Sequence, residues 1–147
     1  WTPEIETSGK YDPHTTDGKS KWVAEEQNRT TAHDATGICM FTTGAGAPLD
    51  DLLPVLSAAT DVDYDMDDFV KIGERIWNIE RLWNLRAGLT AADDSLPERL
   101  LKEAHKEGPS AGVTVNLDAM LPEYYAARGW TPDGKPTQEK LIELGLG

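Results

Sequence analysis

The amino-acid sequence predicts a mainly α protein, an irregular domain of about six or seven helices. Three observations favour this class. Apolar residues recur at spacings of three and four between Phe69 and Leu85, which places them on one face of a helix. Residues suited to helix capping stand at Asp65 and at Ser95, each before a helix-forming run. The segment with strand character, residues 112–115, is short and is equally consistent with an extended link.

The N-terminal part of the chain divides into an arm and a polar helix. Residues 1–16 predict an extended arm, because Pro3, Gly9 and Pro13 interrupt any regular element. The first residues carry neither an initiator Met nor a leader, so we expect the chain to begin within a longer protein. Residues 17–41 contain a helix, expected over 17–33, that Gly37 ends. Its apolar stripe is weak, which predicts that one flank stays exposed or lies against a cofactor, other domains or a neighbouring copy.

Residues 48–147 are expected to form a helical body. Residues 42–47 predict a loop, and residues 48–59 predict a short helix with leucines on one face, kinked or split at Pro54. Residues 66–87 give the clearest helix, which follows the N-cap Asp65 and stops at Gly88. Charged side chains interleave with its broad apolar face. Some of them must meet partners, since a buried unpaired charge is costly.

Shorter elements complete the predicted helical body. Ser95 to Glu98 has the spacing of a capping box, with Pro97 at the first helical position, and the helix is expected to run to about His105. Residues 117–127 and 137–144 predict two further helices, the second stopped by Gly145. Asp133-Gly134 between them predicts a turn.

The length, composition and net charge of the chain limit the classes of function that it can have. The 147 residues make one ordinary domain, and 39% hydrophobic with 27% charged residues is a globular composition. The formal net charge of −12 argues against nucleic acid and against an anionic membrane surface, which both attract basic proteins. No stretch approaches the ~18 apolar residues of a membrane span. The single cysteine, Cys39, allows no internal disulfide, which is typical of the reducing cytoplasm.

The segment Asp34-Ala35-Thr36-Gly37-Ile38-Cys39 is the best candidate for chemistry. A carboxylate accepts hydrogen bonds from an amino-heterocycle, a glycine lets the backbone approach a bulky partner, and a thiolate is the ligand that iron–sulfur clusters prefer. On these residues alone a structural account stands first. It makes Gly37 a helix C-cap, Asp34 a capping or exposed acid, and Cys39 a small buried hydrophobe.

Other polar and aromatic residues are expected to have structural roles. The histidines show no metal-ligand spacing, the Gly-Ala-Gly segment lacks the full spacing of a phosphate loop, the Asp-Asp pair fits turn and cap chemistry, and the aromatic residues fit packing. These residues are His14, His33, His105, Gly44-Ala45-Gly46, Asp93-Asp94, Tyr124-Tyr125 and Trp130.

Several blocks in the second half of the chain, in the right order, resemble the aldehyde:ferredoxin oxidoreductase family. Residues 73–88 resemble its signature helix, and residues 93–99, 117–125, 128–130 and 134–146 resemble the segments that follow. The resemblance is dense over 73–146 and looser over 11–41. In this family an Asp-x-x-Gly-Leu-Cys motif precedes the signature helix. Here Asp34, Gly37 and Cys39 match the motif, and Ile38 replaces its leucine.

The resemblance implies a C-terminal portion of a tungsten-pterin enzyme that converts an aldehyde and water to a carboxylic acid. Asp34 would hydrogen-bond the pterin, with Gly37 and Ile38 beside it. Cys39 would be the fourth ligand of a [4Fe-4S] cluster that passes electrons to ferredoxin. A tungsten-bis-pterin and the cluster would belong to the full-length protein. This chain has one thiolate of four, so alone it is expected to bind neither, to be inactive, and to need the N-terminal and central domains as partners.

Two other functions stay open at this point. One is a related tungsten-pterin reductase acting on an activated aromatic acid. The other is a non-enzymatic helical interaction module that shares only the fold. The sequence leaves open which aldehyde is the substrate, whether the metal is tungsten or molybdenum, which acceptor takes the electrons, and whether the protein forms a homo-oligomer. In the aldehyde oxidoreductase interpretation, Cys39 of this chain is expected to be a free thiol near the surface.

Overall fold

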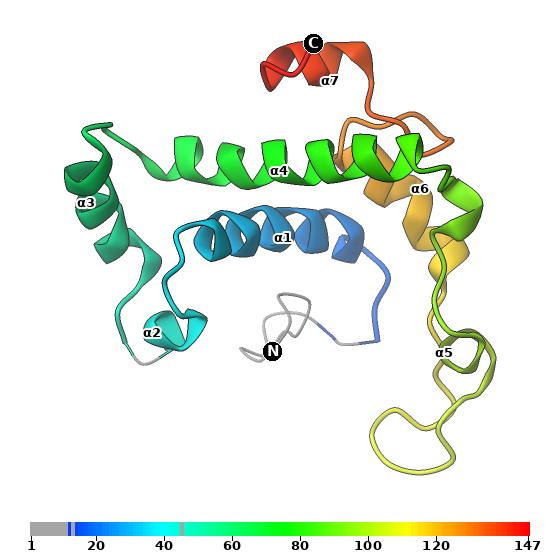
Figure 1. The fold of residues 1–147 in the computed structure, drawn as a ribbon. Helices are drawn as coiled ribbons and strands as arrows, with labels where there is room; N and C mark the ends of the chain where they lie inside the picture. The colour runs from blue at the N-terminus through cyan, green and yellow to red at the C-terminus, as the bar shows by residue number, and fades with distance from the viewer. Residues whose placement is uncertain (1–11, 13, 45) are drawn as a thin grey trace.

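The computed structural model describes residue 12, residues 14–44 and residues 46–147 (Figure 1). Over these residues it has seven α-helices and a short 3-10 helix: α1 Lys19–Ala35, α2 Met40–Gly44, α3 Leu49–Thr60, α4 Met66–Arg86, η1 Ala91–Asp93, α5 Glu98–Lys102, α6 Leu117–Ala127 and α7 Gln138–Glu143. Two isolated β-bridges, His105 with Ala111 and Trp130 with Pro136, join loop residues. The predicted mainly α class with six or seven helices is confirmed. Most of the predicted arm, residues 1–11 and 13, lies outside the described residues.

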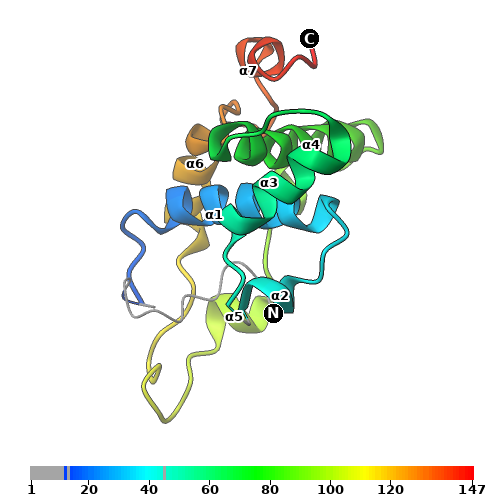
Figure 2. The ribbon, with the colours of Figure 1, turned by 90° about the vertical axis from the view of Figure 1, so that its left-hand side faces the viewer.

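The centre of the fold is the contact between α1 and α4, which lie one above the other in both views (Figures 1 and 2). Gly73 of α4 makes this close approach feasible. A Cβ atom at that position would lie 1.8 Å from the carbonyl oxygen of Asn28 in α1. The Trp77 Nε1 of α4 donates to Thr31 Oγ1 of α1 at 2.8 Å. α6 also packs against α1, where Ser20 Oγ donates to the Met120 carbonyl oxygen at 2.9 Å.

α1 has one exposed flank, as its weak apolar stripe predicted. The side chains at three positions four residues apart are exposed: Lys21, Glu25 and Arg29. Its buried positions are mostly small or polar: Ser20, Ala24, Ala32 and His33. The helix is therefore held by close backbone approach and hydrogen bonds more than by large apolar side chains.

The start of α4 is fixed as the sequence predicted. The Asp65 side chain caps the helix by accepting the Asp68 N–H at 2.8 Å. Phe69 then packs with Ala32 of α1 and Leu53 of α3 in a small apolar core. Pro54 lies inside α3 without splitting it, so the structure contradicts the split and leaves the other predicted outcome, a kink, as a prediction. α3 remains one continuous helix over Leu49–Thr60.

The C-terminal helix α7 lies on the side of α4 that faces away from α1 (Figures 1 and 2). Arg75 Nε of α4 donates to the Leu144 carbonyl oxygen at 2.9 Å, and Lys140 Nζ lies 3.0 Å from a Glu74 carboxylate oxygen. Charged side chains interleaved in α4 thus meet partners, as predicted. None of the described helices combines the length and the apolar character that crossing a membrane requires.

Three local predictions need correction. Part of the predicted loop 42–47 belongs to α2, whose first turn is closed by the Thr42 N–H donating to the Cys39 carbonyl oxygen at 2.9 Å. The predicted capping box at Ser95 is not formed, because α5 starts at Glu98 after Pro97 without a side-chain cap. α5 also ends at Lys102, before the predicted His105.

The capping box forms instead at η1, five residues earlier. The Thr90 side chain accepts from the Ala92 N–H, and the Asp93 carboxylate accepts from the Thr90 N–H at 2.7 Å. Asp93 therefore has the predicted cap role. A hydroxyl residue followed by an acid three positions later occurs twice in this stretch, and Thr90 rather than Ser95 provides the cap.

Candidate functional site

The C-terminal end of α1 is held in a defined turn by Thr36, a residue that the sequence analysis did not single out. Thr36 Oγ1 donates to the His33 carbonyl oxygen at 2.7 Å and accepts from the Ile38 N–H at 3.1 Å. The Gly37 N–H donates to the Asp34 carbonyl oxygen at 3.1 Å. A hydroxyl residue at a helix end commonly makes such local bonds, and this was the available signal.

The segment from Asp34 to Cys39 presents its two reactive side chains to solvent. Asp34 and Gly37 are exposed, Ile38 is half-buried, and Cys39 is an exposed free thiol. Gly37 has φ +75°, a left-handed conformation that favours glycine, and the space beyond its Cα is open. The account of Cys39 as a buried hydrophobe is therefore wrong, and the prediction of a surface thiol is confirmed. Binding of a cofactor by these residues stays a prediction.

His33, one residue before this segment, is buried with 4% of its surface exposed. Its Nε2 atom has no hydrogen-bond partner among the described residues. Buried polar atoms are almost always paired in folded proteins, so this nitrogen is an exception to the usual pattern. His33 was expected from the sequence to have a structural role, and no sequence pattern indicated this unpaired nitrogen.

The described residues do not assemble a metal site of their own. Among them, no group of three or more His, Cys, Asp and Glu side chains lies close enough to hold a metal ion. His14 lies elsewhere, with its Nε2 3.0 Å from Ser110 Oγ. A cavity of about 440 Å³ adjoins that contact and is lined by Lys19 at the N-terminal end of α1. At ~1.5 Å per helical residue, Lys19 stands ~20 Å from Asp34, so this cavity is remote from the segment.

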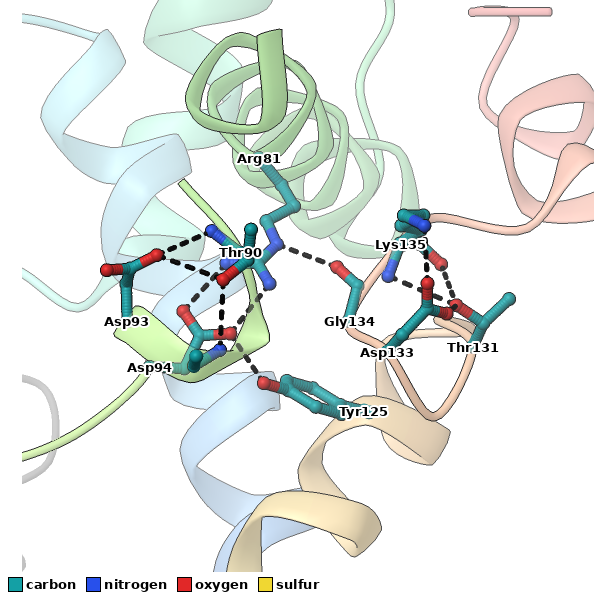
Figure 3. A network of polar contacts seen from close by, with 10 residues as sticks. Arg81, Thr90, Asp93, Asp94, Tyr125, Thr131, Asp133, Gly134 and Lys135 are labelled. Carbon is teal, nitrogen blue, oxygen red and sulfur yellow. Dashed lines mark hydrogen bonds and ion pairs between the residues drawn. The ribbon is translucent and has the colours of Figure 1, made fainter. Parts of the chain in front are cut away.

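An ion pair between the buried Arg81 and the partly exposed Asp94 connects several elements around α4 (Figure 3). Arg81 is 7% exposed and donates to both carboxylate oxygens of Asp94, at 2.7 and 2.6 Å. Its Nε donates to the Gly134 carbonyl oxygen at 2.7 Å, and the Tyr125 hydroxyl donates to Asp94. The pair thus joins α4, the loop after η1, α6 and the turn at Asp133-Gly134. A Cβ on Gly134 would meet the Arg81 guanidinium at 2.4 Å.

The protonation behaviour of this network follows from its contacts. Burial alone would raise the pKa of Asp94, but the hydrogen bonds from Arg81 and Tyr125 outweigh it and lower that pKa. Burial, together with the hydrogen bond to Asp94, raises the pKa of Tyr125 to about 12. At neutral pH the network therefore holds a carboxylate, a guanidinium and a neutral phenol. These charges are matched, which indicates a structural role.

A second buried arginine, Arg128 of the loop after α6, ties α6 to α1. It is 1% exposed and donates to the side-chain oxygens of Gln27 and Asn28 in α1, at 2.6 Å to Gln27. Its guanidinium lies 4.8 Å from the ring centroid of Trp77 and 5.1 Å from that of Tyr124. Both contacts are in the range of cation–π interactions. Arg128 therefore holds α1, α4 and α6 together at one point.

The aromatic residues expected to pack also form hydrogen bonds. Tyr124 donates its hydroxyl to Gln27 at 2.7 Å, Tyr125 donates to Asp94, and Trp130 Nε1 donates to Asn78 Oδ1 at 2.9 Å. Packing was predicted correctly, and the polar partners were missed. The interleaved arginine, asparagine and glutamate residues of α4 were the signal that such partners exist.

The sequence of this chain matches one protein family and several named relatives. The family described as "Aldehyde ferredoxin oxidoreductase, domains 2 & 3" matches residues 1–146. Relatives from Pyrococcus furiosus and Pyrococcus horikoshii, both named tungsten-containing aldehyde ferredoxin oxidoreductase, are 53% identical over 140 residues, or 93% of this chain. A relative of the same name from Thermococcus kodakarensis is 50% identical over the same length. The chain spans 23% of the length of each of these relatives.

A solved structure shares the fold. It is the active-site complex BamBC of a benzoyl coenzyme A reductase in complex with 1,5-dienoyl-CoA. It superposes with a TM-score of 0.69 at 22% identity and covers 97% of this chain and 21% of that chain. At this identity the likeness concerns the fold alone. The family match over nearly the whole chain and the identity to the three archaeal relatives agree with the blocks found in the sequence, and the chain belongs to the aldehyde ferredoxin oxidoreductase family.

Proposed function

We propose that this chain supplies the C-terminal helical part of a tungsten-pterin aldehyde:ferredoxin oxidoreductase. Its contribution is the segment from Asp34 to Cys39, with Cys39 as one ligand of a [4Fe-4S] cluster and Asp34 as a hydrogen-bond acceptor for the pterin. When bound, the tungsten-pterin and the cluster supply the oxidation of an aldehyde and water to a carboxylic acid, with two electrons passed to ferredoxin. The observation that carries the proposal is the exposed thiol of Cys39 beside the fixed turn of α1.

The residues present fit such a role in their chemistry. A thiolate is the usual ligand of an iron–sulfur cluster, and Cys39 is free and exposed. The exposed carboxylate of Asp34 accepts N–H groups of an amino-heterocycle, and the open space at Gly37 lets a bulky group approach the backbone.

The chain's own residues hold this segment in place. Thr36 fixes the backbone turn between Asp34 and Cys39 through its hydrogen bonds to His33 and Ile38. The close contact at Gly73 and the buried Arg128 hold α1 against α4 and α6. A ligand that is oriented before binding loses less conformational entropy when the cofactor binds.

The remaining ligands and the pterin domain must come from other domains. One thiolate does not bind a four-iron cluster, and the described residues form no group of three metal ligands. The chain spans 23% of the length of its relatives, which leaves room for those domains. Trp83 is 67% exposed and Ile142 is 66% exposed, and large apolar side chains of this kind suit a contact with further polypeptide. Alone, the chain is therefore expected to be inactive and free of both cofactors.

A related reductase acting on an activated aromatic acid is the second candidate. The fold likeness to the benzoyl coenzyme A reductase complex favours it. The relatives named tungsten-containing aldehyde ferredoxin oxidoreductase are more than twice as similar in sequence, at 50% to 53% against 22% identity, and favour aldehyde oxidation. Family membership favours either enzyme over a non-enzymatic interaction module.

Elemental analysis and an activity assay of the full-length protein test the proposed function. We expect tungsten and iron together, and reduction of a viologen acceptor with an aldehyde as electron donor. Activity on an aromatic acyl-coenzyme A without aldehyde oxidation would support the reductase instead. A correctly folded protein purified without oxygen that holds neither metal would leave only the interaction module.

A further inference from the structure

A histidine and a serine that are far apart in the sequence meet away from the segment at the end of α1. His14 precedes α1, and Ser110 lies in the loop that joins α5 to α6 (Figure 1). The His14 Nε2 atom lies 3.0 Å from Ser110 Oγ, a hydrogen-bond distance between residues 96 positions apart. An imidazole within hydrogen-bond reach of a serine hydroxyl can take its proton and so activate the oxygen as a nucleophile.

A carboxylate lies at the other nitrogen of this imidazole. An Asp12 carboxylate oxygen is 3.7 Å from His14 Nδ1, longer than a hydrogen bond but within the range of an ion pair. The same oxygen accepts the His14 backbone N–H at 2.8 Å, which holds the carboxylate beside the ring. A carboxylate on this side favours the tautomer with the proton on Nδ1, which leaves Nε2 as the acceptor for the serine hydroxyl. The three groups therefore stand in the order of a nucleophilic triad: carboxylate, imidazole, hydroxyl.

The pair adjoins a cavity of suitable size for a small substrate. His14 and Ser110 both line this cavity of about 440 Å³, a volume within the range of small-molecule sites. Apolar side chains form part of its wall and favour an acyl chain: Val23, Leu100, Val113, Val115 and Met120. Lys19 also lines the cavity, and a cation is a group of the kind that stabilises an oxyanion.

The contact between the two side chains also leaves them accessible. The His14 side chain is 33% exposed and Ser110 is half-buried. Water can satisfy the ring nitrogens of an imidazole that is this exposed, so burial does not require the bond to Ser110. In this respect the pair differs from the buried arginines Arg81 and Arg128, whose charges need partners within the protein.

We propose that Asp12, His14 and Ser110 form a hydrolytic site for small uncharged esters. Ser110 Oγ bonds to the ester carbonyl carbon while His14 Nε2 takes the hydroxyl proton. The ester C–O bond then breaks, and this proton passes to the leaving alcohol. Water, deprotonated by His14, cleaves the acyl-serine, which releases the carboxylic acid and restores the serine. Neither the family match nor the relatives assign such a site, and its chemistry needs no metal and no electron transfer.

Hydrolysis of p-nitrophenyl butyrate by the full-length protein tests this proposal. We expect a rate above that in buffer. Ser110→Ala and His14→Gln are each expected to lower the rate by about 100-fold, the lower range of general-base catalysis. Ser95→Ala removes an exposed serine that does not line the cavity and serves as the matched control, with an unchanged rate.

A covalent probe on the wild-type protein guards against a variant that fails to fold. A fluorophosphonate reacts with a serine activated in this way, and peptide mass spectrometry locates it. We expect the label on Ser110 and its loss in His14→Gln. No hydrolysis above that in buffer, full hydrolysis in Ser110→Ala, or no label on Ser110 would each overturn the proposal. The proposed function fails separately, through the metal content and the cluster signal, and Ser110→Ala is expected to keep the tungsten, the iron and aldehyde oxidation of wild type.

Discussion

At the scale of single residues, two buried arginines connect several elements of this fold. Arg81 and Arg128 are 7% and 1% exposed, yet each has matched partners on other elements. Arg81 donates two hydrogen bonds to the carboxylate of Asp94. The planar guanidinium suits this bidentate geometry better than a lysine ammonium does. Arg128 meets neutral amide oxygens and aromatic faces. Each bond is directional, so together they select one arrangement of helices that otherwise share small contact faces.

Removing one partner of the buried pair tests this role. Asp94→Asn leaves the Arg81 guanidinium buried without a counter-charge, and we expect it to lower the free energy of unfolding by about 3 kcal/mol. Urea unfolding of the 147-residue chain measures the effect. Asp133→Asn is the matched control, because Asp133 pairs with Lys135 at the exposed surface and its loss is expected to leave the unfolding midpoint unchanged. Equal effects of the two substitutions would contradict a special role for the buried pair.

At the scale of elements, the position of α1 depends on a glycine in α4. Gly73→Ala places a Cβ 1.8 Å from the Asn28 carbonyl oxygen, a backbone atom that moves only if the helices separate. We expect a loss of about 1–3 kcal/mol, the usual effect of overpacking, rather than the gain that alanine gives in an open helix. Thermal unfolding measures it. Glu80→Ala, at an exposed position of the same helix, is the control and is expected to stay within about 0.5 kcal/mol. A stabilised Gly73→Ala chain would show that α1 does not pack there.

The long elements were predictable from the sequence because one local signal determined each. The spacing of apolar residues after Phe69 and the cap at Asp65 defined α4 to within a residue. The short elements depended on competition between local signals. The capping box was predicted at Ser95 and formed at Thr90, and α2 extends to Gly44, into the segment where a loop was predicted. Periodicity carries no information about such choices between neighbouring hydrogen-bonding groups.

The residues of the candidate site could be predicted from the sequence, but the residues that hold them in place could not. The motif identified Asp34, Gly37 and Cys39, because a resemblance preserves reactive residues in order. The role of Thr36 was missed, since it depends on which groups form hydrogen bonds in the folded chain. The exposure of Cys39 also required the fold, because a thiol after a helix end is equally consistent with a core position.

At the scale of the whole molecule, α1 has a part that is packed against other helices and a C-terminal end that carries the exposed candidate segment. Arg128 and Gly73 hold the middle of α1 against α6 and α4, and Ser20 ties its N-terminal end to α6. The segment from Asp34 to Cys39 begins in the last turn of α1, beyond these contacts, and continues as the loop that leads to α2 (Figure 2). This arrangement presents a carboxylate and a thiol from a rigid helix, which suits a contribution to a site completed by other domains.

The central claim, that Cys39 is a cluster ligand, is tested most directly by Cys39→Ser in the full-length enzyme. The paramagnetic resonance signal of the reduced cluster and the iron content are measured beside those of wild type. Ala58→Ser, at an exposed position of α3, is the control and is expected to match wild type in both. Because Cys39 is exposed and serine is close to it in size, the substitution is expected to change the stability of the 147-residue chain by no more than about 1 kcal/mol. Our account predicts an altered or lost cluster signal with less iron in the full-length Cys39→Ser enzyme. An unchanged signal with full activity would contradict it.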